Sequence, residues 1–325
     1  MGRCSDCQRY MTRRPIDVSV VIVSWNVRDF LRRSIESIDS SHGDLSIELI
    51  VVDNASVDGS IEMVRVEFPH VHTIDSGSNI GFARANNIAL GHATGRYVFF
   101  LNPDTLVSDK ALLNMVHFLD SHTEFAAVGP RLLDADGAVQ PICARMLPSL
   151  SLALFHSLYI HRLPILGDRL QNRLISPYDL DQSQEVEAIS GAAMLVRRNG
   201  LEIVGGFDES FLYTAEDIDL CMRLRRRVGR VFYLADAEVV HFGGQSSAQA
   251  FSRAGTMSIL STAAYFERSQ GRRHALVYRL SIQFFHTPAL LLVGLVKFLF
   301  GRGTLQELME RVNLAKAVWR WRVSE

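Results

Sequence analysis

The strongest constraint on the fold is a regular alternation of short apolar runs with amphipathic stretches. Four apolar runs predict buried strands, at residues 18–23, 47–52, 71–74 and 97–101. Apolar residues at helical spacing predict the helices that follow them, at residues 30–38, 61–68, 82–89 and 108–119. Ser108 is the expected N-cap of the last helix. Four strand–helix units in succession predict an α/β fold with a parallel sheet and right-handed crossovers.

Polar residues stand where these predicted strands end. They are Ser24, Asn26, Asp53, Asn54 and Asp104. Ligands of such sheets bind beyond the carboxyl ends of the strands, so we expect these five residues to converge. No G-x-G-x-x-G follows the first strand and no G-x-x-x-x-G-K-[ST] occurs, which argues against an ordinary dinucleotide site or a P-loop.

Later segments are less regular. Residues 141–183 contain four prolines and are interpreted as a variable insert with one or two short helices. A last strand is expected at residues 231–240. We predict a flexible tail at 1–16, a catalytic domain at 17–267 that includes the insert, and a helical C-terminal region at 268–325.

Composition excludes several classes of protein. Hydrophobic residues make up 48% of the 325 and the formal net charge is −1, which excludes a disordered chain. Four cysteines are too few for a disulfide scaffold. Residues 1–14 lack the apolar stretch of a signal peptide, so a cytoplasmic body with reduced thiols is expected. Cys4-x-x-Cys7 is interpreted as part of a loose tail, with a zinc or redox role as the alternative.

The C-terminal region differs in charge from the rest of the chain. Residues 268–325 hold ten basic and three acidic side chains, which favours an anionic membrane surface over nucleic acid. The 17 residues between Arg279 and Lys297 contain no Asp, Glu, Lys or Arg, and Pro288 interrupts them. That length is the lower limit for a membrane span, so we predict an interfacial or re-entrant segment at 280–300, followed by an amphipathic helix at 305–319. The alternative is a hydrophobic hairpin packed on the body.

Three polar residues at strand ends have chemistry suited to a nucleotide. The Asp53 carboxylate can accept hydrogen bonds from a nucleobase imide or a ribose hydroxyl; the alternative is a helix cap. Asp104, on a bend fixed by Pro103, can hold a divalent cation that bridges a diphosphate; the alternative is a plain turn. His241, expected in a Gly-rich loop, is a candidate cation ligand or phosphate contact, although most single histidines are neither.

Carboxylates also begin the helix predicted after Thr214. Glu216-Asp217-Ile-Asp219 could supply a general base. The alternative is structural: Thr214 and Asp217 have the spacing of a capping box, and Asp219 is spaced to pair with Arg223.

Eight segments, taken together and in this order, resemble glycosyltransferase family 2. They are Val18–Asn26, Val51–Ser60, Asn79–Asn87, Phe100–Thr105, Ser190–Met194, Gly206–Phe211, Glu216–Arg223 and His241–Ser246. The resemblance covers about residues 17 to 265 and implies the GT-A fold, a Rossmann-like, mostly parallel sheet flanked by helices. Within the family the chain most resembles bacterial rhamnosyltransferase-like enzymes of cell-surface polysaccharide assembly.

The resemblance implies a donor site. Asp53 would contact the base or ribose of a dTDP-, UDP- or GDP-sugar. The other residues assigned to the donor are Ser24, Asn26, Asn54, Asn79, Arg84, Asn102 and Glu216. Many family members carry an Arg-Asn pair where this chain has Asn86-Asn87, so the nearby Arg84 is the candidate for the arginine that contacts the diphosphate.

The resemblance also implies a metal and a base. Asn102-Pro-Asp104 stands where the family keeps its D-x-D, so Asp104 would bind Mg²⁺ or Mn²⁺ with help from His241, although Asn102 replaces the first Asp. Asp217 would be the catalytic base of an inverting single displacement. The acceptor would be a glycan or lipid-linked sugar, and the enzyme would lie on the cytoplasmic face of the cell membrane as a peripheral or monotopic protein, with no nucleic acid partner.

Two other functions compete with this one. A sugar nucleotidyltransferase could share the sheet, but it needs a Gly-rich loop after the first strand, and Ser24–Asp29 contains no glycine. A non-catalytic membrane-bound module would bind a nucleotide-sugar without releasing nucleoside diphosphate.

Overall fold

The computed structural model describes residues 15–158, 178–211, 214–243 and 251–320, without the side chains of 251–258. Cys4 and Cys7, most of the predicted tail, residues 159–177 of the insert, and Ser246 lie outside the described residues. The sequence-based expectations for those positions stay predictions.

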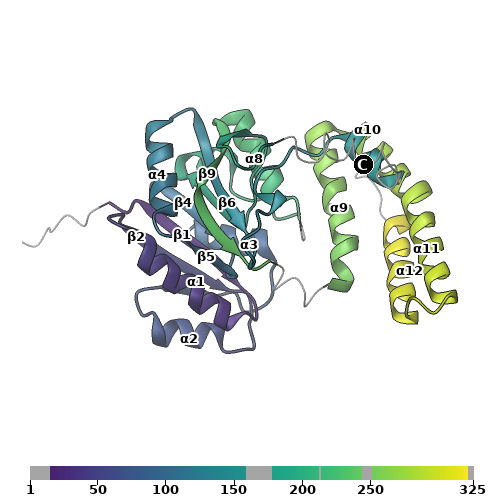
Figure 1. Ribbon diagram of the computed structural model, residues 1–325, viewed down its shortest axis with the longest axis horizontal. Coiled ribbons are helices and arrows are strands. Elements are labelled where there is room, and N and C mark those ends of the chain that lie inside the picture. The colour runs from purple at the N-terminus through teal and green to yellow at the C-terminus, as the bar shows by residue number, and fades with distance from the viewer. Residues whose placement is uncertain (1–14, 159–177, 212–213, 244–250, 321–325) are drawn as a thin grey trace, which may run out of the picture.

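Within the described residues one sheet holds nine strands (Figure 1). They are β1 (Val18–Ser24), β2 (Ile47–Asp53), β3 (His72–Asp75), β4 (Tyr97–Leu101), β5 (Thr105–Val107), β6 (Phe125–Leu133), β7 (Gln184–Val186), β8 (Ala193–Arg197) and β9 (Arg230–His241). The order is β3-β2-β1-β4-β8-β6-β9-β5, and β7 pairs with β9. The first four strands are mutually parallel, as the sequence predicts.

The second half of the sheet is mixed. Strand β8 runs antiparallel between β4 and β6, while β6 and β9 are parallel neighbours. Both β5 and β7 pair antiparallel with β9. The expected last strand is confirmed as β9, but His241 is its final residue and does not belong to the loop beyond it.

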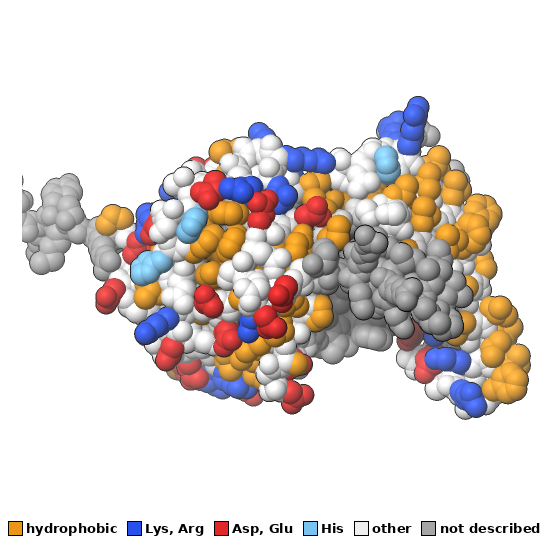
Figure 2. All heavy atoms as spheres, turned by 45° about the horizontal axis from the view of Figure 1, so that its top comes forward, with side chains coloured by type: hydrophobic (Ala, Val, Ile, Leu, Met, Phe, Trp, Pro, Cys, Tyr) orange, Lys and Arg blue, Asp and Glu red, His pale blue; other side chains and the backbone are white. Residues whose placement is uncertain are grey.

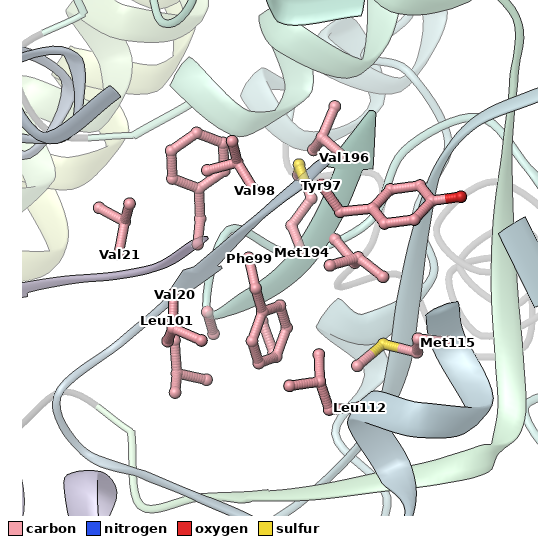
Figure 3. Packing of buried hydrophobic residues seen from close by; sticks show 14 of the residues in the cluster. Val20, Val21, Tyr97, Val98, Phe99, Leu101, Leu112, Met115, Met194 and Val196 are labelled. Atoms are coloured by element: carbon pink, nitrogen blue, oxygen red, sulfur yellow. The ribbon is translucent and has the colours of Figure 1, made fainter. Parts of the chain in front are cut away.

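The helices of this part of the chain cover the sheet. They are α1 (Arg28–Ser41), α2 (Ser60–Glu67), α3 (Phe82–Leu90), α4 (Ala111–Ser121), the 3₁₀ turn η2 (Pro141–Cys143), α7 (Arg198–Val204) and α8 (Glu216–Arg227). Helix α5 (Leu150–Ser157) packs instead against helices of the C-terminal region. All of β1 is buried, as expected of a strand with helices on both faces of its sheet. Figure 3 shows Phe99 of β4 beside Leu112 and Met115 of α4, and all three side chains are fully buried.

The predicted N-cap at Ser108 is wrong. Helix α4 begins at Ala111 after Lys110, whose φ of 64° is left-handed, and no side chain caps it. The backbone N–H of Ser108 donates to the carbonyl of Glu238, so Ser108 extends the β5–β9 pairing.

The C-terminal helices stand beside the sheet domain (Figure 1). They are α9 (Phe251–Gln270), α10 (Arg272–Ser281), the π-helical turn η5 (Ile282–His286), α11 (Thr287–Leu299) and α12 (Leu305–Arg320). A second hydrophobic core joins Phe211, Ala215 and Met222 to α9, α10, η5 and α12. The expected domain boundary after residue 267 falls inside α9, and the division stays a prediction.

Residues Arg272–Leu299 run as one helix of 28 residues, long and apolar enough by length and composition to cross a membrane. Pro288 does not interrupt this helix. It occupies the first turn of α11, and the π-helical turn directly before it accommodates a residue that lacks an N–H. The predicted helix after residue 304 is confirmed as α12.

Candidate active site

The loops after β1 and β2 are bound to each other at the carboxyl edge of the sheet. Asn26, with a left-handed φ of 54°, donates its N–H to Ser56 Oγ at 3.0 Å and accepts the N–H of Val57 on Oδ1 at 2.7 Å. The N–H of Asn54 donates to the carbonyl of Ser24 at 2.7 Å. These bonds fix the wall of the site on which Asp53 lies.

Asp53 presents one free carboxylate oxygen. The residue is 2% exposed and its Oδ2 accepts the N–H of Ser56 at 2.9 Å. Its Oδ1 is buried and has no hydrogen-bond partner among the described residues; the same holds for Ser24 Oγ. A buried acceptor without a donor is costly, so Oδ1 is suited to an incoming N–H or O–H. Asp53 does not cap α2, whose N-cap is Gly59.

Asn54 and Asn79 bind each other. Asn54 donates to Asn79 Oδ1 at 3.0 Å and accepts the N–H of Ile80 at 2.9 Å. Arg84 is largely exposed, and its Nε lies 3.9 Å from Glu209 Oε2. The two asparagines therefore tie β2 to the loop before α3, while Arg84 is left mostly in solvent.

Asn87 also has a structural role. Its amide donates to the carbonyl of Phe207 at 2.8 Å and accepts the N–H of Phe207 at 2.9 Å. These two hydrogen bonds fix the loop around Phe207 against α3.

Asp104, directly before β5, faces His241, the last residue of β9. Residues 105 and 241 are paired across β5 and β9, and His241 Nε2 lies 3.6 Å from Asp104 Oδ1. Asn102 Nδ2 lies 3.4 Å from the same ring nitrogen. Asp104 is 4% exposed and His241 is 6% exposed. Burial lowers the pKa of His241 despite the nearby Asp104, which keeps the imidazole neutral and able to act as a ligand.

A carboxylate and a neutral imidazole together suit a divalent cation such as Mn²⁺. No group of three or more His, Cys, Asp or Glu side chains within the described ranges could hold a metal ion. The Asp104–His241 pair therefore fits a cation that takes its remaining ligands from water or from a bound diphosphate.

Asp217 is held from two sides. Its Oδ2 accepts a short hydrogen bond from Arg145 and a second from the N–H of Gly191 at 2.9 Å. The next residue, Ala192, accepts the N–H of Asn102 on its carbonyl at 2.8 Å. Asp217 is thereby connected through two residues to the strand end that carries Asp104.

The capping box considered as the structural alternative at Thr214 does not form. Ala215 is the N-cap of α8, with a left-handed φ of 74° and no side-chain cap. Ala215 packs into the second core, and the carboxylate of Asp217 is occupied by Arg145 and Gly191.

Glu216 has a different environment from its neighbour. Its Oε2 is buried without a hydrogen-bond partner among the described residues. Burial, followed by the charge of Asp217, raises the pKa of Glu216 to about 8. Asp219, in contrast, forms the expected pair with Arg223 at 2.6 Å, and Arg223 also donates to the carbonyls of Val204 and Gly206.

Sequence reasoning missed Gln140 and Arg145. Both belong to the irregular segment after β6, and Arg145 pairs through its backbone with Ala188. The available signal was a polar residue directly before Pro141 and a basic residue within an apolar stretch, and neither is distinctive.

The mixed α/β fold with its central sheet is similar to that of GT-A glycosyltransferases. A mannosyltransferase of Pyrobaculum calidifontis, solved with GDP-Man and Mn²⁺, superposes with a TM-score of 0.52 and 18% identity, over 95% of this chain and 87% of that one. GalNAc-T7 with UDP, GalNAc and Mn²⁺ gives a TM-score of 0.52 at 14% identity, over 70% and 43%. Residues 19–149 match the family model "Glycosyl transferase family 2".

Two relatives of similar length are rhamnosyltransferases. An N-acetylglucosaminyl-diphospho-decaprenol L-rhamnosyltransferase of Mycobacterium tuberculosis is 29% identical over 70% of this chain and 76% of its own length. Rhamnosyltransferase WbbL of Escherichia coli is 26% identical over 78% and 94%. The chain is accordingly a hexosyltransferase of cell-surface glycan synthesis, which favours the transferase over the nucleotidyltransferase and the binding module.

Proposed function

We propose that this protein is an inverting glycosyltransferase that moves L-rhamnose from a nucleoside diphosphate sugar to a lipid-linked glycan acceptor. The observation that carries the proposal is the connection of Asp217, through Gly191 and Ala192, to the strand end that bears Asn102 and Asp104. The names of the two relatives support rhamnose as the sugar. The decaprenol in the name of the mycobacterial relative supports a lipid-linked acceptor.

The donor nucleotide lies against the end of β2. Asp53 Oδ1, which is buried and free, accepts a hydrogen bond from the base or ribose. Asp53 Oδ2 stays on the N–H of Ser56, so the carboxylate offers a single acceptor. A pyrimidine imide has one N–H to donate, and this match favours a dTDP- or UDP-sugar over a GDP-sugar.

The diphosphate lies at Asp104 and His241. These two residues would hold Mg²⁺ or Mn²⁺, and the mannosyltransferase and GalNAc-T7 structures, both solved with Mn²⁺, support this assignment. When bound, the cation supplies positive charge that offsets the charge of the departing diphosphate. Asn102 Nδ2 lies 3.4 Å from His241 Nε2, so the Asn102 side chain stands beside this ligand.

Asp217 is the base. It accepts the proton of the acceptor hydroxyl, whose oxygen attacks the anomeric carbon from the face opposite the diphosphate and inverts its configuration. Arg145 and the N–H of Gly191 hold the carboxylate in one orientation. The raised pKa of Glu216 keeps that neighbour protonated at neutral pH, so Asp217 is the charged member of this adjacent pair.

The C-terminal helices attach the enzyme to the cytoplasmic face of the membrane as a peripheral or monotopic protein. Large apolar side chains are exposed on their outer side (Figure 2): Phe284, Phe285, Leu292, Leu295, Leu299, Phe300, Leu305, Met309 and Trp319. We call this set the outer apolar face. Basic residues at the helix ends, among them Arg272, Arg273 and Arg302, add attraction to anionic lipids.

A donor panel tests the proposal. The full chain is incubated with dTDP-rhamnose, UDP-galactose or GDP-mannose and a polyprenyl diphosphate N-acetylglucosamine acceptor, and glycolipid product is measured. We expect transfer from dTDP-rhamnose and inversion at its anomeric carbon. Transfer only from another donor would overturn the assignment of rhamnose, and a retained configuration would overturn the single displacement.

A further inference from the structure

Gln140, the residue directly before the expected variable insert at 141–183, lies beside the proposed cation site. Its N–H donates to the carbonyl of Leu132 in β6 at 2.8 Å, and Leu132 is paired with Val239 of β9. Gln140 is therefore anchored one strand away from His241, 101 residues apart in sequence.

The side chain of Gln140 makes two hydrogen bonds to His241. Its Nε2 donates to the backbone carbonyl of His241 at 2.7 Å, and its Oε1 lies 2.9 Å from the ring Nδ1. A carbonyl can only accept, so the amide nitrogen must face it and the amide oxygen must face the ring. Nδ1 must then carry the hydrogen that it donates to Gln140.

The second ring nitrogen is left as an acceptor. With the ring neutral and its hydrogen on Nδ1, Nε2 keeps a lone pair. Nε2 is 3.6 Å from Asp104 Oδ1 and 3.4 Å from Asn102 Nδ2. Nε2 of His241 and Oδ1 of Asp104 are both electron-rich, and two such atoms facing each other suit a cation. In the other tautomer Nε2 would carry the hydrogen and point it toward Asp104, so the imidazole could not bind the cation through Nε2.

We propose that Gln140 is a positioning residue that fixes His241 in the Nδ1–H tautomer and so presents Nε2, together with Asp104, to the divalent cation. The inference rests on the proposed function, in which Asp104 and His241 hold that cation. Hydrogen bonds of this kind to ligating histidines contribute roughly 10- to 100-fold to metal affinity.

The test compares two variants of the full chain. Gln140→Met has a similar length and removes both hydrogen bonds. Gln140→Glu keeps an acceptor for Nδ1–H and removes only the bond to the carbonyl. Gln184→Met is the control, because Gln184 donates to the carbonyls of Asp179 and Gln182, away from the site.

Two readouts are measured. Ring ¹⁵N and ¹³C chemical shifts of labelled histidine, assigned with a His241→Asn variant, report the tautomer without metal. We expect Nδ1–H in the wild type and in Gln140→Glu, and loss of that preference in Gln140→Met. Electron paramagnetic resonance titration of Mn²⁺ should show affinity about 10- to 100-fold weaker for Gln140→Met, within a few fold of wild type for Gln140→Glu, and unchanged for the control.

The inference is overturned if wild-type His241 is Nε2–H, or if Gln140→Met leaves the ring shifts and the Mn²⁺ affinity unchanged. A separate variant tests whether Asp104 and His241 bind the cation at all. An Asp104→Asn variant that binds Mn²⁺ as tightly as the wild type would overturn that part of the proposed function, while the ring shifts still decide the role of Gln140 in the tautomer.

Discussion

Two adjacent carboxyl groups at the start of α8 have opposite surroundings. Asp217 accepts hydrogen bonds from a guanidinium and a backbone N–H, whereas a buried oxygen of Glu216 has no partner among the described residues. Separate environments allow one member of such a pair to stay neutral while the other is charged. The two residues can therefore differ in role although they are neighbours in sequence.

The raised pKa of Glu216 makes stability depend on pH. Below its ordinary value of 4.5 the carboxyl is protonated in the folded and unfolded states alike. Between 4.5 and about 8 only the unfolded chain releases the proton, so the free energy of unfolding falls as pH rises through this window. Glu216→Gln cannot titrate, and its melting temperature relative to wild type should be higher at about pH 8 than at about pH 5.

Thermal denaturation at the two pH values checks this expectation. Glu202→Gln is the matched control, because the Glu202 side chain is 61% exposed on α7, and it should follow the wild-type curve. A Glu216→Gln variant with the same pH dependence as wild type would show that this carboxyl titrates normally.

Local patterns identify some site residues and miss others. Asp53 and Asp104 follow strands, and Asp217 and His241 lie in recognisable segments, so sequence alone nominates them; their catalytic roles stay proposals. Gln140 and Arg145 act on partners 101 and 72 positions away. A contact of that separation depends on how the irregular segment returns to the sheet, and no local pattern encodes it.

The turn that begins α8 depends on close contact with the start of β8. A Cβ on Gly191 would lie 3.2 Å from Asp217 Cβ and 3.6 Å from its Oδ2. That spacing is tighter than an ordinary contact, so any side chain at residue 191 pushes Asp217 away from its position.

Gly191→Ala should lower turnover by roughly 10-fold while leaving donor affinity unchanged, because small displacements of a reacting group cost rate more than binding. Steady-state kinetics and donor titration measure the two effects. Gly200→Ala is the control: its Cβ would lie 3.1 Å from Val228 Cγ1, equally tight but away from Asp217. Equal turnover in the two variants would argue against a strict position for Asp217.

The elements that sequence predicts best are those with local causes. Strands β1, β2 and β4 are largely buried apolar runs, whereas β3 lies at the edge of the sheet and is exposed or half-buried, which corrects the prediction of a buried strand there. Each of the four lies within a residue or two of its expected range. The N-cap expected at Ser108 and the alternative capping box at Thr214 do not form, because tertiary contacts involve the residues at both helix starts. The Ser108 N–H donates to the carbonyl of Glu238 and so extends the β5–β9 pairing, and Ala215 packs in the second core.

On the scale of the whole molecule, the second core connects the turn that begins α8 to the C-terminal helices. Phe211 and Ala215 pack with Phe266, Tyr278 and residues farther along the chain. The sequence shows an apolar, basic region at 268–325 but not where its helices pack. The side chains of the outer apolar face are exposed and do not belong to this core.

A double variant tests that surface. Leu299 and Phe300 are 68% and 76% exposed at the end of α11. Leu299→Glu combined with Phe300→Glu should weaken binding to phosphatidylglycerol-containing vesicles by more than about 10-fold, because burying each large apolar side chain contributes about 1.5–3 kcal/mol.

Vesicle flotation of the full chain measures this change. Val66→Glu is the matched control, since Val66 is 80% exposed but lies on α2 in the sheet domain. If the control releases the protein as strongly as the double variant, the outer apolar face is not the membrane contact.

The most direct test of the central claim is rhamnosyl transfer by Asp217→Asn. If Asp217 is the base at a site shared with Asp104, turnover should fall by roughly 10²–10⁴-fold. Affinity for dTDP-rhamnose should stay close to that of wild type, and Asp29→Asn, on the exposed start of α1, should be fully active. Near-normal turnover of Asp217→Asn would contradict the account.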